Sequence, residues 1–247
     1  MGTEERIERR PRGAAVVTGG AGGIGLALLA RLGRDGFQPV SWDLDSAASE
    51  AALSLVVDAT DAAALDRAAA ETVARAGPIG ALVVNAGILG PVARVWEVDP
   101  AEVRRVIDTN LVSAFLTLRA VVPHMLSNAG PDRGRIVLMA SVQAKEGTAL
   151  AGPYAASKAG LVVLAKTLGK ELAEAGVLVN AVTPTVVRTA MERAITPERR
   201  ADLLGRIPLR RFLDPVEVAA LVSWLCGPEC SFSTGAVFDL SGGRSTY

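Results

Sequence analysis

A tyrosine and a lysine four positions apart could act together as a proton-transfer pair. The stretch GPYAASKAG (152–160) contains Tyr154 and Lys158, and the chain has only two tyrosines and four lysines. On a helix, this spacing places both side chains on one face. Pro153 suits the start of a helix, which would place Tyr154 in the first turn, near the positive end of the helix dipole. We therefore expect the dipole and the ammonium group to lower the pKa of Tyr154, so that it can act as both acid and base.

A serine precedes this pair by thirteen residues. Ser141 follows the apolar run RIVLMA (135–140), which is typical of a buried strand. In open α/β sheets, ligands bind at the carboxyl ends of the strands, so this hydroxyl could hold the oxygen of a reacting carbonyl group. The alternative is that Tyr154 and Lys158 merely form a helix surface, which requires the spacing of all three residues to be accidental.

A glycine-rich turn, TGGAGGIG (18–25), lies between an apolar run and a helix-forming stretch. Glycines let the backbone approach a pyrophosphate, whose charge the following helix N-terminus stabilises. The turn therefore predicts a dinucleotide site. Two registers fit it: Gly20, Gly22 and Gly25 as G-x-G-x-x-G, or Gly19, Gly23 and Gly25 as T-G-x-x-x-G-x-G.

A carboxylate follows the second predicted strand. Asp43 lies eighteen residues beyond Gly25, where it could accept hydrogen bonds from the adenosine ribose and repel a 2′-phosphate. No arginine or lysine occurs in the surrounding SWDLDS. We therefore predict NAD as the cofactor in preference to NADP. The alternative is a helix-capping role, for which Asp45 is also suited.

The elements that must position these residues are short apolar runs alternating with Ala- and Leu-rich stretches. Seven runs have strand length: 14–18, 39–42, 53–57, 81–84, 135–140, 177–182 and 236–240. Their continuous apolar character is typical of strands covered by helices on both faces. The sequence therefore predicts an α/β protein, a single Rossmann-type doubly wound domain with a seven-stranded parallel sheet. The two longest helical stretches, roughly 100–128 and 153–174, should flank the middle of that sheet.

Two segments fall outside this alternation. Residues 1–12 mix acids with arginines, which predicts a flexible N-terminus ahead of a catalytic domain over 13–247. Residues 188–212 carry many charges and two prolines, which predicts a helical flap over the substrate. A solvated surface connection is the alternative for this segment.

The composition excludes several classes of function. The formal net charge is zero and no block of like charges occurs, so we expect no nucleic-acid partner. Cys226 and Cys230 are too few for a disulfide framework and lack companion ligands for zinc, so we expect reduced thiols and no metal. No run approaches the roughly 20 apolar residues of a membrane span. Together with the absence of a recognisable targeting signal, this predicts a cytoplasmic protein with no membrane partner.

The glycine-rich turn and the Ser141, Tyr154 and Lys158 spacing resemble the short-chain dehydrogenase/reductase family over nearly the whole chain. VVNAG (83–87) is similar to the fourth-strand motif of that family. The resemblance implies that Asn110, in DTNL, completes the catalytic set by holding a water relay to the lysine. It implies these cofactor-binding residues: Gly19, Gly23, Ile24, Gly25, Asp43, Asp58, Ala59, Asn85, Ala86, Gly87, Tyr154, Lys158, Pro184, Val187 and Thr189.

The resemblance extends to TPTVVRT (183–189), which is similar to the P-G-x-V-x-T segment of the family. Thr185 stands where the family usually has glycine, and a side chain there would alter the floor of the nicotinamide pocket. Family members are commonly tetramers built through the two long helices and the C-terminal strand. The resemblance therefore implies a homo-oligomer, a tetramer or a dimer.

These residues together predict an NAD-dependent oxidoreductase that interconverts a secondary alcohol and a ketone. Tyr154 would remove the alcohol proton, Ser141 would hold the developing carbonyl oxygen, and Lys158 would bind the nicotinamide ribose. A 3-oxoacyl-(acyl-carrier-protein) reductase is the alternative; family members of that kind usually prefer NADP. A nucleotide-sugar enzyme and a non-catalytic dinucleotide sensor are more distant alternatives. The short C-terminal region argues against the former and the intact catalytic set against the latter.

The loop between Ser141 and Tyr154 bears on the substrate. Its Gln143, Lys145 and Glu146 are polar, which favours a small polar substrate. The KEG triplet also resembles NAD-dependent dehydrogenases of sugar acids, including 2-keto-3-deoxy acids, and Arg188 could bind a carboxylate. In the alternative, Lys145 and Glu146 form a solvated turn and Arg188 faces bulk water. The predicted substrate contacts are Ser141, Gln143, Lys145, Tyr154 and Arg188.

Overall fold

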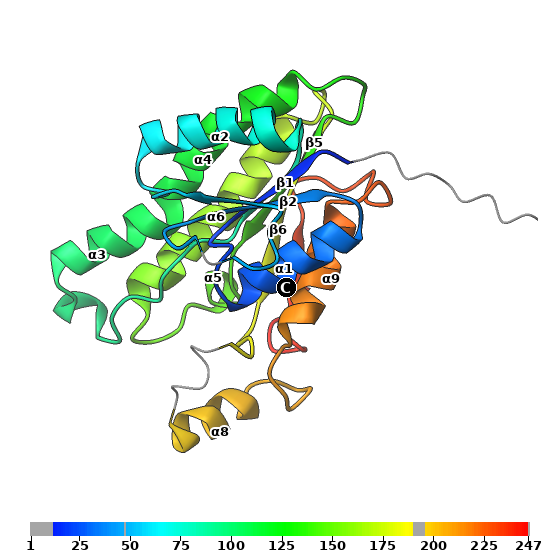
Figure 1. The fold of residues 1–247 in the computed structure, drawn as a ribbon. Coiled ribbons are helices and arrows are strands. Elements are labelled where there is room, and N and C mark those ends of the chain that lie inside the picture. Colours follow the sequence, from blue (N-terminus) through cyan, green and yellow to red (C-terminus); the bar gives the residue numbers. More distant parts are fainter. Residues whose placement is uncertain (1–11, 47, 190–195, 247) are drawn as a thin grey trace, which may run out of the picture.

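A parallel sheet forms the centre of the computed structural model, which describes residues 12–46, 48–189 and 196–246. In this part of the chain the sheet has seven strands in the order β3-β2-β1-β4-β5-β6-β7 (Figure 1). All neighbouring strands are parallel. The strands are β1 (Ala14–Thr18), β2 (Gln38–Asp43), β3 (Leu53–Val56), β4 (Ile79–Val84), β5 (Gly134–Met139), β6 (Val177–Pro184) and β7 (Val237–Leu240). The predicted fold class is confirmed.

Helices cover both faces of the sheet (Figure 1). One face carries α1 (Gly23–Arg34) and α9 (Pro215–Leu225), which pack against each other. The other face carries α2 (Ala62–Ala76), α4 (Ser113–Leu126) and α6 (Gly152–Glu171). The shorter helices are η1 (Val95–Glu97), α3 (Pro100–Ile107), η2 (Asp108–Val112), α5 (Gln143–Glu146) and α8 (Pro197–Gly205).

The hydrophobic core forms two layers because successive strand residues point to opposite faces. On β6, Val177, Val179 and Ala181 belong to the layer shared with α4 and α6, whereas Val182 belongs to the layer shared with α1 and α9. All four are completely buried. Strands buried on both faces explain why the sequence shows continuous apolar runs.

The chain reverses its direction across the sheet between β1 and β4. From β1 it proceeds to β2 and β3 on one side, then returns to β4 and continues to β7 on the other. Such a switch point is where ligands bind in doubly wound sheets. The predicted site residues that end or follow the strands at this carboxyl edge are Gly19, Asp43, Asp58, Asn85, Ser141 and Pro184.

The first long helix differs from its prediction. A π-helical turn over residues 108–112 joins α3 to α4, so the predicted 100–128 helix is interrupted. By length and composition the run Pro100–Leu126 could cross a membrane. However, Leu118, Val121 and Met125 are buried against the sheet, as in a core helix of a globular domain.

The predicted flap lies partly outside the described residues, because residues 190–195 are not among them. The described part contains α8, which buries none of its side chains and lies away from the sheet (Figure 1). Residues 1–11 are also outside the described part. The flexible N-terminus and the flap therefore stay predictions.

Candidate active site

The glycine-rich turn connects β1 to α1, and the steric room at each glycine distinguishes its two registers. Gly19 has a φ of 66°, and a Cβ on Gly25 would overlap the carbonyl oxygen of Gly19. A Cβ on Gly23 would lie 2.9 Å from the side chain of Thr189, whereas Gly22 has room for one. The positive φ of Gly19 and the contact at Gly23 favour the register of Gly19, Gly23 and Gly25, although a Cβ on Gly20 would also overlap the side chain of Ser41. Ile24, between two of them, is partly buried against the α1 layer of the core.

Asp43 at the end of β2 reaches the glycine-rich turn. Its Oδ2 accepts a hydrogen bond of 2.9 Å from the backbone N–H of Ala21, and its Oδ1 accepts one from the N–H of Asp45. The carboxylate is partly exposed and directly faces the turn that would hold a pyrophosphate. This position fits the predicted contact with an adenosine ribose.

The end of β4 is tied to the same turn. The side-chain amide of Asn85 donates to the carbonyl oxygens of Thr18 and Gly19, each at 3.1 Å. The Thr18 hydroxyl in turn accepts from the N–H groups of Asn85 and Ala86. Asn85 therefore joins two loops of the predicted cofactor site. Thr18 was not predicted, although it begins the TGGAGGIG motif.

Asn110 lies in the π-helical turn and is completely buried. Its Oδ1 accepts from the N–H of Ile88, and its Nδ2 donates to the Ile88 carbonyl and to the hydroxyl of Ser157. The side chain thus fixes the segment after β4 against α6. The predicted water relay stays a prediction, and Ser157, next to Lys158, is a partner that the sequence motifs did not indicate.

Lys158 lies inside the site. The residue is 4% exposed, and its ammonium group donates a 2.8 Å hydrogen bond to the carbonyl oxygen of Met139 and lies 5.8 Å from the centre of the Tyr154 ring. Burial lowers the pKa of Lys158 from 10.5 to about 8. A Cβ on Gly87 would approach both Lys158 Nζ and Asn110 Oδ1, so Gly87 belongs to the same cluster.

Tyr154 lies in the first turn of α6, as predicted, and its hydroxyl is hydrogen-bonded to Ser141. Ser141 is buried, and its Oγ accepts a hydrogen bond of 3.2 Å from the N–H of Gln143. Burial raises the pKa of Tyr154, and the bond to Ser141 opposes that effect. The expected lowering of this pKa is therefore wrong for the protein alone, because desolvation of the phenolate outweighs the other effects.

The loop after Ser141 is anchored and not a solvated turn. It contains α5, whose Lys145 lies 3.3 Å from Oδ1 of Asp239 on β7. Glu146 forms a two-armed ion pair with Arg244, whose side chain is 5% exposed. These contacts connect α5 to the C-terminal strand and to the residues that follow it.

The segment after β6 contains the remaining predicted contacts. Val187 is buried and forms a bridge with Leu213, while Thr189 lies beside Gly23. Arg188 is about half exposed and forms an ion pair of 3.2 Å with Asp214. A substrate carboxylate would therefore compete with Asp214 for this guanidinium group.

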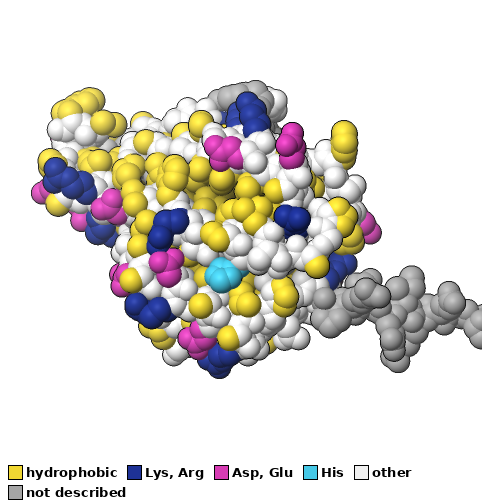
Figure 2. Space-filling model, turned by 90° about the horizontal axis from the view of Figure 1, so that it is seen from above, with side chains coloured by type: hydrophobic (Ala, Val, Ile, Leu, Met, Phe, Trp, Pro, Cys, Tyr) yellow, Lys and Arg dark blue, Asp and Glu magenta, His cyan; other side chains and the backbone are white. Residues whose placement is uncertain are grey.

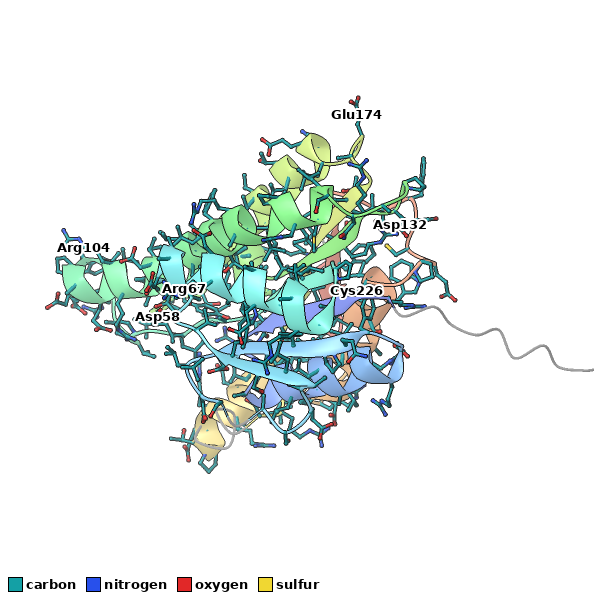
Figure 3. The ribbon with its side chains drawn as sticks, turned by 45° about the horizontal axis from the view of Figure 1, so that its top comes forward. Asp58, Arg67, Arg104, Asp132, Glu174 and Cys226 are labelled. Carbon is teal, nitrogen blue, oxygen red and sulfur yellow. The ribbon has the colours of Figure 1, made fainter. Side chains whose placement is uncertain are left out.

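Asp58 and Ala59 follow β3. The carboxylate of Asp58 accepts hydrogen bonds from the side chain and the backbone of Thr60, which lower its pKa. Figure 3 shows Asp58 far from Asp132 and Cys226, which lie toward the opposite edge of the sheet. There, a cavity of about 670 Å³ is lined by residues that include His124 and Cys226. This cavity is therefore separate from the predicted site.

Both cysteines of the described chain are unpaired and buried. Burial raises the pKa of Cys226 to about 12, so this thiol is not activated. Among the residues that the structure describes, no cluster of three or more histidine, cysteine or acidic side chains could hold a metal ion.

The geometry fits a dinucleotide. The turn after β1 has three glycines, Gly20, Gly23 and Gly25, at which a Cβ would clash with neighbouring atoms. Asp43 lies beside this turn, and a partly buried tyrosine and a buried lysine lie where the nicotinamide half would reach. The fold and the site thus define a dinucleotide-dependent oxidoreductase.

Comparison with known proteins gives the family. The family described as enoyl-(acyl carrier protein) reductase matches residues 19–245. A 2-dehydro-3-deoxy-L-rhamnonate dehydrogenase (NAD(+)) of Sphingomonas sp. (strain SKA58) is 41% identical over 241 residues, covering 94% of this chain and 95% of that protein. The chain therefore belongs to the short-chain dehydrogenase/reductase family, as its motifs predicted.

Two acyl reductases are also similar to this chain. The 3-oxoacyl-[acyl-carrier-protein] reductase MabA of Mycobacterium bovis is 35% identical over 230 residues, covering 93% of this chain and 92% of that protein. The crystal structure of a 3-ketoacyl-(acyl-carrier-protein) reductase from Brucella melitensis complexed with NADH has a TM-score of 0.88 at 28% identity, covering 95% of this chain and 98% of that chain. An acyl reductase similar to this chain can therefore bind NADH, so a site suited to NAD does not by itself exclude that activity.

Proposed function

We propose that this protein is an NAD-dependent oxidoreductase that interconverts a secondary alcohol and a ketone on a small polar substrate, a sugar acid of the 2-keto-3-deoxy type. One observation supports the reaction class most directly. Tyr154, Ser141 and Lys158 form one cluster at the carboxyl edge of the sheet, in which Ser141 and Lys158 are buried and Tyr154 is partly exposed, beside a turn suited to a pyrophosphate.

The cluster supports proton transfer at the substrate oxygen, while the cofactor supplies or accepts the hydride. Because the pKa of Tyr154 is raised, its phenol is protonated at neutral pH and can donate to the oxygen of a ketone. Ser141 is oriented by the N–H of Gln143 and can hold the same oxygen. In the direction of alcohol oxidation, Tyr154 accepts the proton, and the ammonium group of Lys158 stabilises the phenolate.

NAD is the proposed cofactor. Asp43 places a carboxylate beside the turn after β1, where it would bind ribose hydroxyls and repel a 2′-phosphate. The Sphingomonas relative is named as an NAD(+) enzyme, which supports the same choice.

A polar substrate is favoured by the groups around Ser141. Gln143 and Lys145 lie on α5, immediately after the serine, and the Sphingomonas relative acts on a sugar acid by its name. The second candidate is a 3-oxoacyl-(acyl-carrier-protein) reductase, which the similarity to the Mycobacterium and Brucella enzymes favours.

A substrate panel tests the choice between these candidates. Initial rates of NADH formation would be measured with polyhydroxy acids, medium-chain secondary alcohols and 3-hydroxyacyl thioesters, each with NAD and NADP. The proposal requires the highest kcat/KM with a polyhydroxy acid and NAD. A clear preference for the thioesters would replace it with the acyl reductase.

We also propose that the protein is a homo-oligomer, a dimer or a tetramer. Figure 2 shows hydrophobic side chains gathered on the face that carries α4 and α6. Phe115 and Val163 on these helices are 52% and 62% exposed, and β7 forms an edge of the sheet near Phe232, which is fully exposed. Large exposed apolar patches of this kind mark association surfaces. Light scattering of the purified protein measures its mass directly, and a monomeric mass would reject this proposal.

A cytoplasmic location is proposed as well, because both buried cysteines are unpaired and suit a reducing compartment. Localisation of a fluorescent fusion with the full chain tests it.

A further inference from the structure

Two buried polar atoms next to the active-site serine have no hydrogen-bond partner within the protein. They are Oε1 of Gln143 and Oγ1 of Thr185. Buried polar atoms in folded proteins are nearly always paired, so each exception calls for an explanation. When such atoms lie at a ligand site, the ligand itself can supply the missing partner.

The two residues follow neighbouring strands and lie close to each other. The N–H of Val142 donates a 2.9 Å hydrogen bond to the carbonyl oxygen of Pro184, which extends the pairing of β5 with β6. Gln143 and Thr185 are the next residues on these two segments. The N–H of Gln143 is also bonded to the hydroxyl of Ser141, so this residue directly adjoins the catalytic cluster.

Both residues lie at the edge of the sheet that carries the catalytic cluster. Thr185 directly follows β6, and Gln143 is two residues beyond Ser141 after β5, so both are at the carboxyl ends of neighbouring strands. Ligands bind at this edge in doubly wound sheets.

The fold does not account for the hydroxyl group of Thr185. The backbone N–H of this residue pairs with the carbonyl oxygen of Leu240, and its side chain is buried with its oxygen unpaired. A β-branched apolar side chain would fill the same volume without an unpaired oxygen.

We propose that Thr185, together with Gln143, selects substrates that carry a second hydroxyl group beside the reacting carbinol. A hydroxyl group can accept a hydrogen bond from the Thr185 O–H and donate one to Gln143 Oε1. A methylene can do neither, and a thioester carbonyl cannot donate. The inference rests on the proposed function and narrows it to polyhydroxylated acids, with Thr185 as the residue that determines specificity.

The test measures selectivity as the ratio of kcat/KM for a hydroxylated substrate to kcat/KM for its deoxy analogue. Wild type, Thr185→Val, Thr185→Ser and Gln143→Leu would be assayed with a polyhydroxy acid and with its analogue that lacks the neighbouring hydroxyl. Valine keeps the size and the β-branch of threonine, and serine keeps the hydroxyl. Thr167→Val, which removes an exposed hydroxyl from α6, is the matched control.

Wild type should favour the hydroxylated acid in kcat/KM. Thr185→Val and Gln143→Leu should each reduce this ratio on the order of 10-fold, because kcat/KM for the hydroxylated acid falls more than kcat/KM for its analogue. Thr185→Ser and Thr167→Val should keep the ratio, and NADH affinity, measured by fluorescence, should stay unchanged in the control Thr167→Val.

A wild-type ratio in both Thr185→Val and Gln143→Leu would overturn the inference and leave the proposed function standing. If Thr185→Val does not fold, the selectivity ratios of Gln143→Leu and Thr185→Ser test the inference: it requires a reduced ratio in Gln143→Leu and the wild-type ratio in Thr185→Ser. A wild type that oxidises no polyhydroxy acid would overturn the proposed function, and the inference with it. These two failures are distinguished by the wild-type rates.

Discussion

Replacing Lys158 with methionine should abolish turnover and at the same time make the protein more stable at neutral pH. The side chain is 4% exposed, and its charge is stabilised within the protein by one hydrogen bond, to the carbonyl oxygen of Met139. Methionine has a similar length and carries no charge. The variant therefore separates the requirement of catalysis for a cation from the cost of burying it.

The pKa of Lys158 gives the magnitude and the sign of the expected change in the free energy of unfolding. It falls from 10.5 to about 8 on folding, and each pH unit between the two values corresponds to about 1.4 kcal/mol. The charged lysine thus costs the folded state about 3 kcal/mol at pH 7. Between about pH 8 and pH 10.5 the unfolded chain binds more protons than the folded protein, so wild-type stability rises with pH through this window.

Loss of the hydrogen bond to Met139 offsets part of the gain by about 1 kcal/mol, but this offset does not depend on pH. The pH dependence of the stability difference between Lys158→Met and wild type is therefore the more specific test. Relative to wild type, the advantage of Lys158→Met in the free energy of unfolding should decrease by about 3 kcal/mol between pH 7 and pH 10.5.

Urea unfolding followed by tryptophan fluorescence at several pH values measures this difference. Lys166→Met, on an exposed position of the same helix, is the matched control and should show no such dependence. If the difference between wild type and Lys158→Met stayed constant from pH 7 to pH 10.5, the assignment of a buried, destabilising charge would be refuted.

Three further predictions follow from the site. Tyr154→Phe should lower kcat by about 10²- to 10⁴-fold without weakening NADH binding, while Thr167→Val keeps wild-type rates; near-native turnover in Tyr154→Phe would move the proton transfer to another group. Asp43→Ala should narrow the ratio of kcat/KM between NAD and NADP by at least about 10-fold, because it removes the repulsion of a 2′-phosphate; an unchanged ratio would remove Asp43 from cofactor selection. Glu146→Gln should lower the melting temperature by several degrees, measured calorimetrically, because Arg244 loses its charged partner while 5% exposed; an unchanged melting temperature would show that this ion pair is not stabilising.

The fold could be predicted because its signals are local. The central strands β1, β4, β5 and β6 are buried on both faces and therefore appear as continuous apolar runs, and each predicted run overlaps a strand of the structure. The same local signals also predicted where the catalytic residues lie. Ser141 follows a predicted strand, and Tyr154 and Lys158 lie at the start of a predicted helix.

Properties that depend on three-dimensional packing could not be predicted. The pKa of Tyr154 was expected to fall, because the sequence shows a lysine and a helix start but not the desolvation of the phenol. The glycine register required the room around Gly22 and Gly23, because only a side chain at Gly23 would press against Thr189. The roles of Thr18 and Ser157 depend on hydrogen bonds to residues 67 and 47 positions away, and no spacing rule connects such residues.

The double contact of Asp43 limits how the cofactor preference of this protein could evolve. One oxygen of this carboxylate accepts from the N–H of Ala21 in the turn that would bind the pyrophosphate, so the residue that would discriminate between cofactors also shapes their common binding loop. Single-nucleotide changes in an aspartate codon give asparagine, histidine, tyrosine, alanine, glycine, valine or glutamate. Of these, asparagine loses the negative charge and keeps an acceptor oxygen at the same distance from the backbone. Asparagine is therefore the accessible first step toward NADP, because it relaxes discrimination while the bond to the turn is kept.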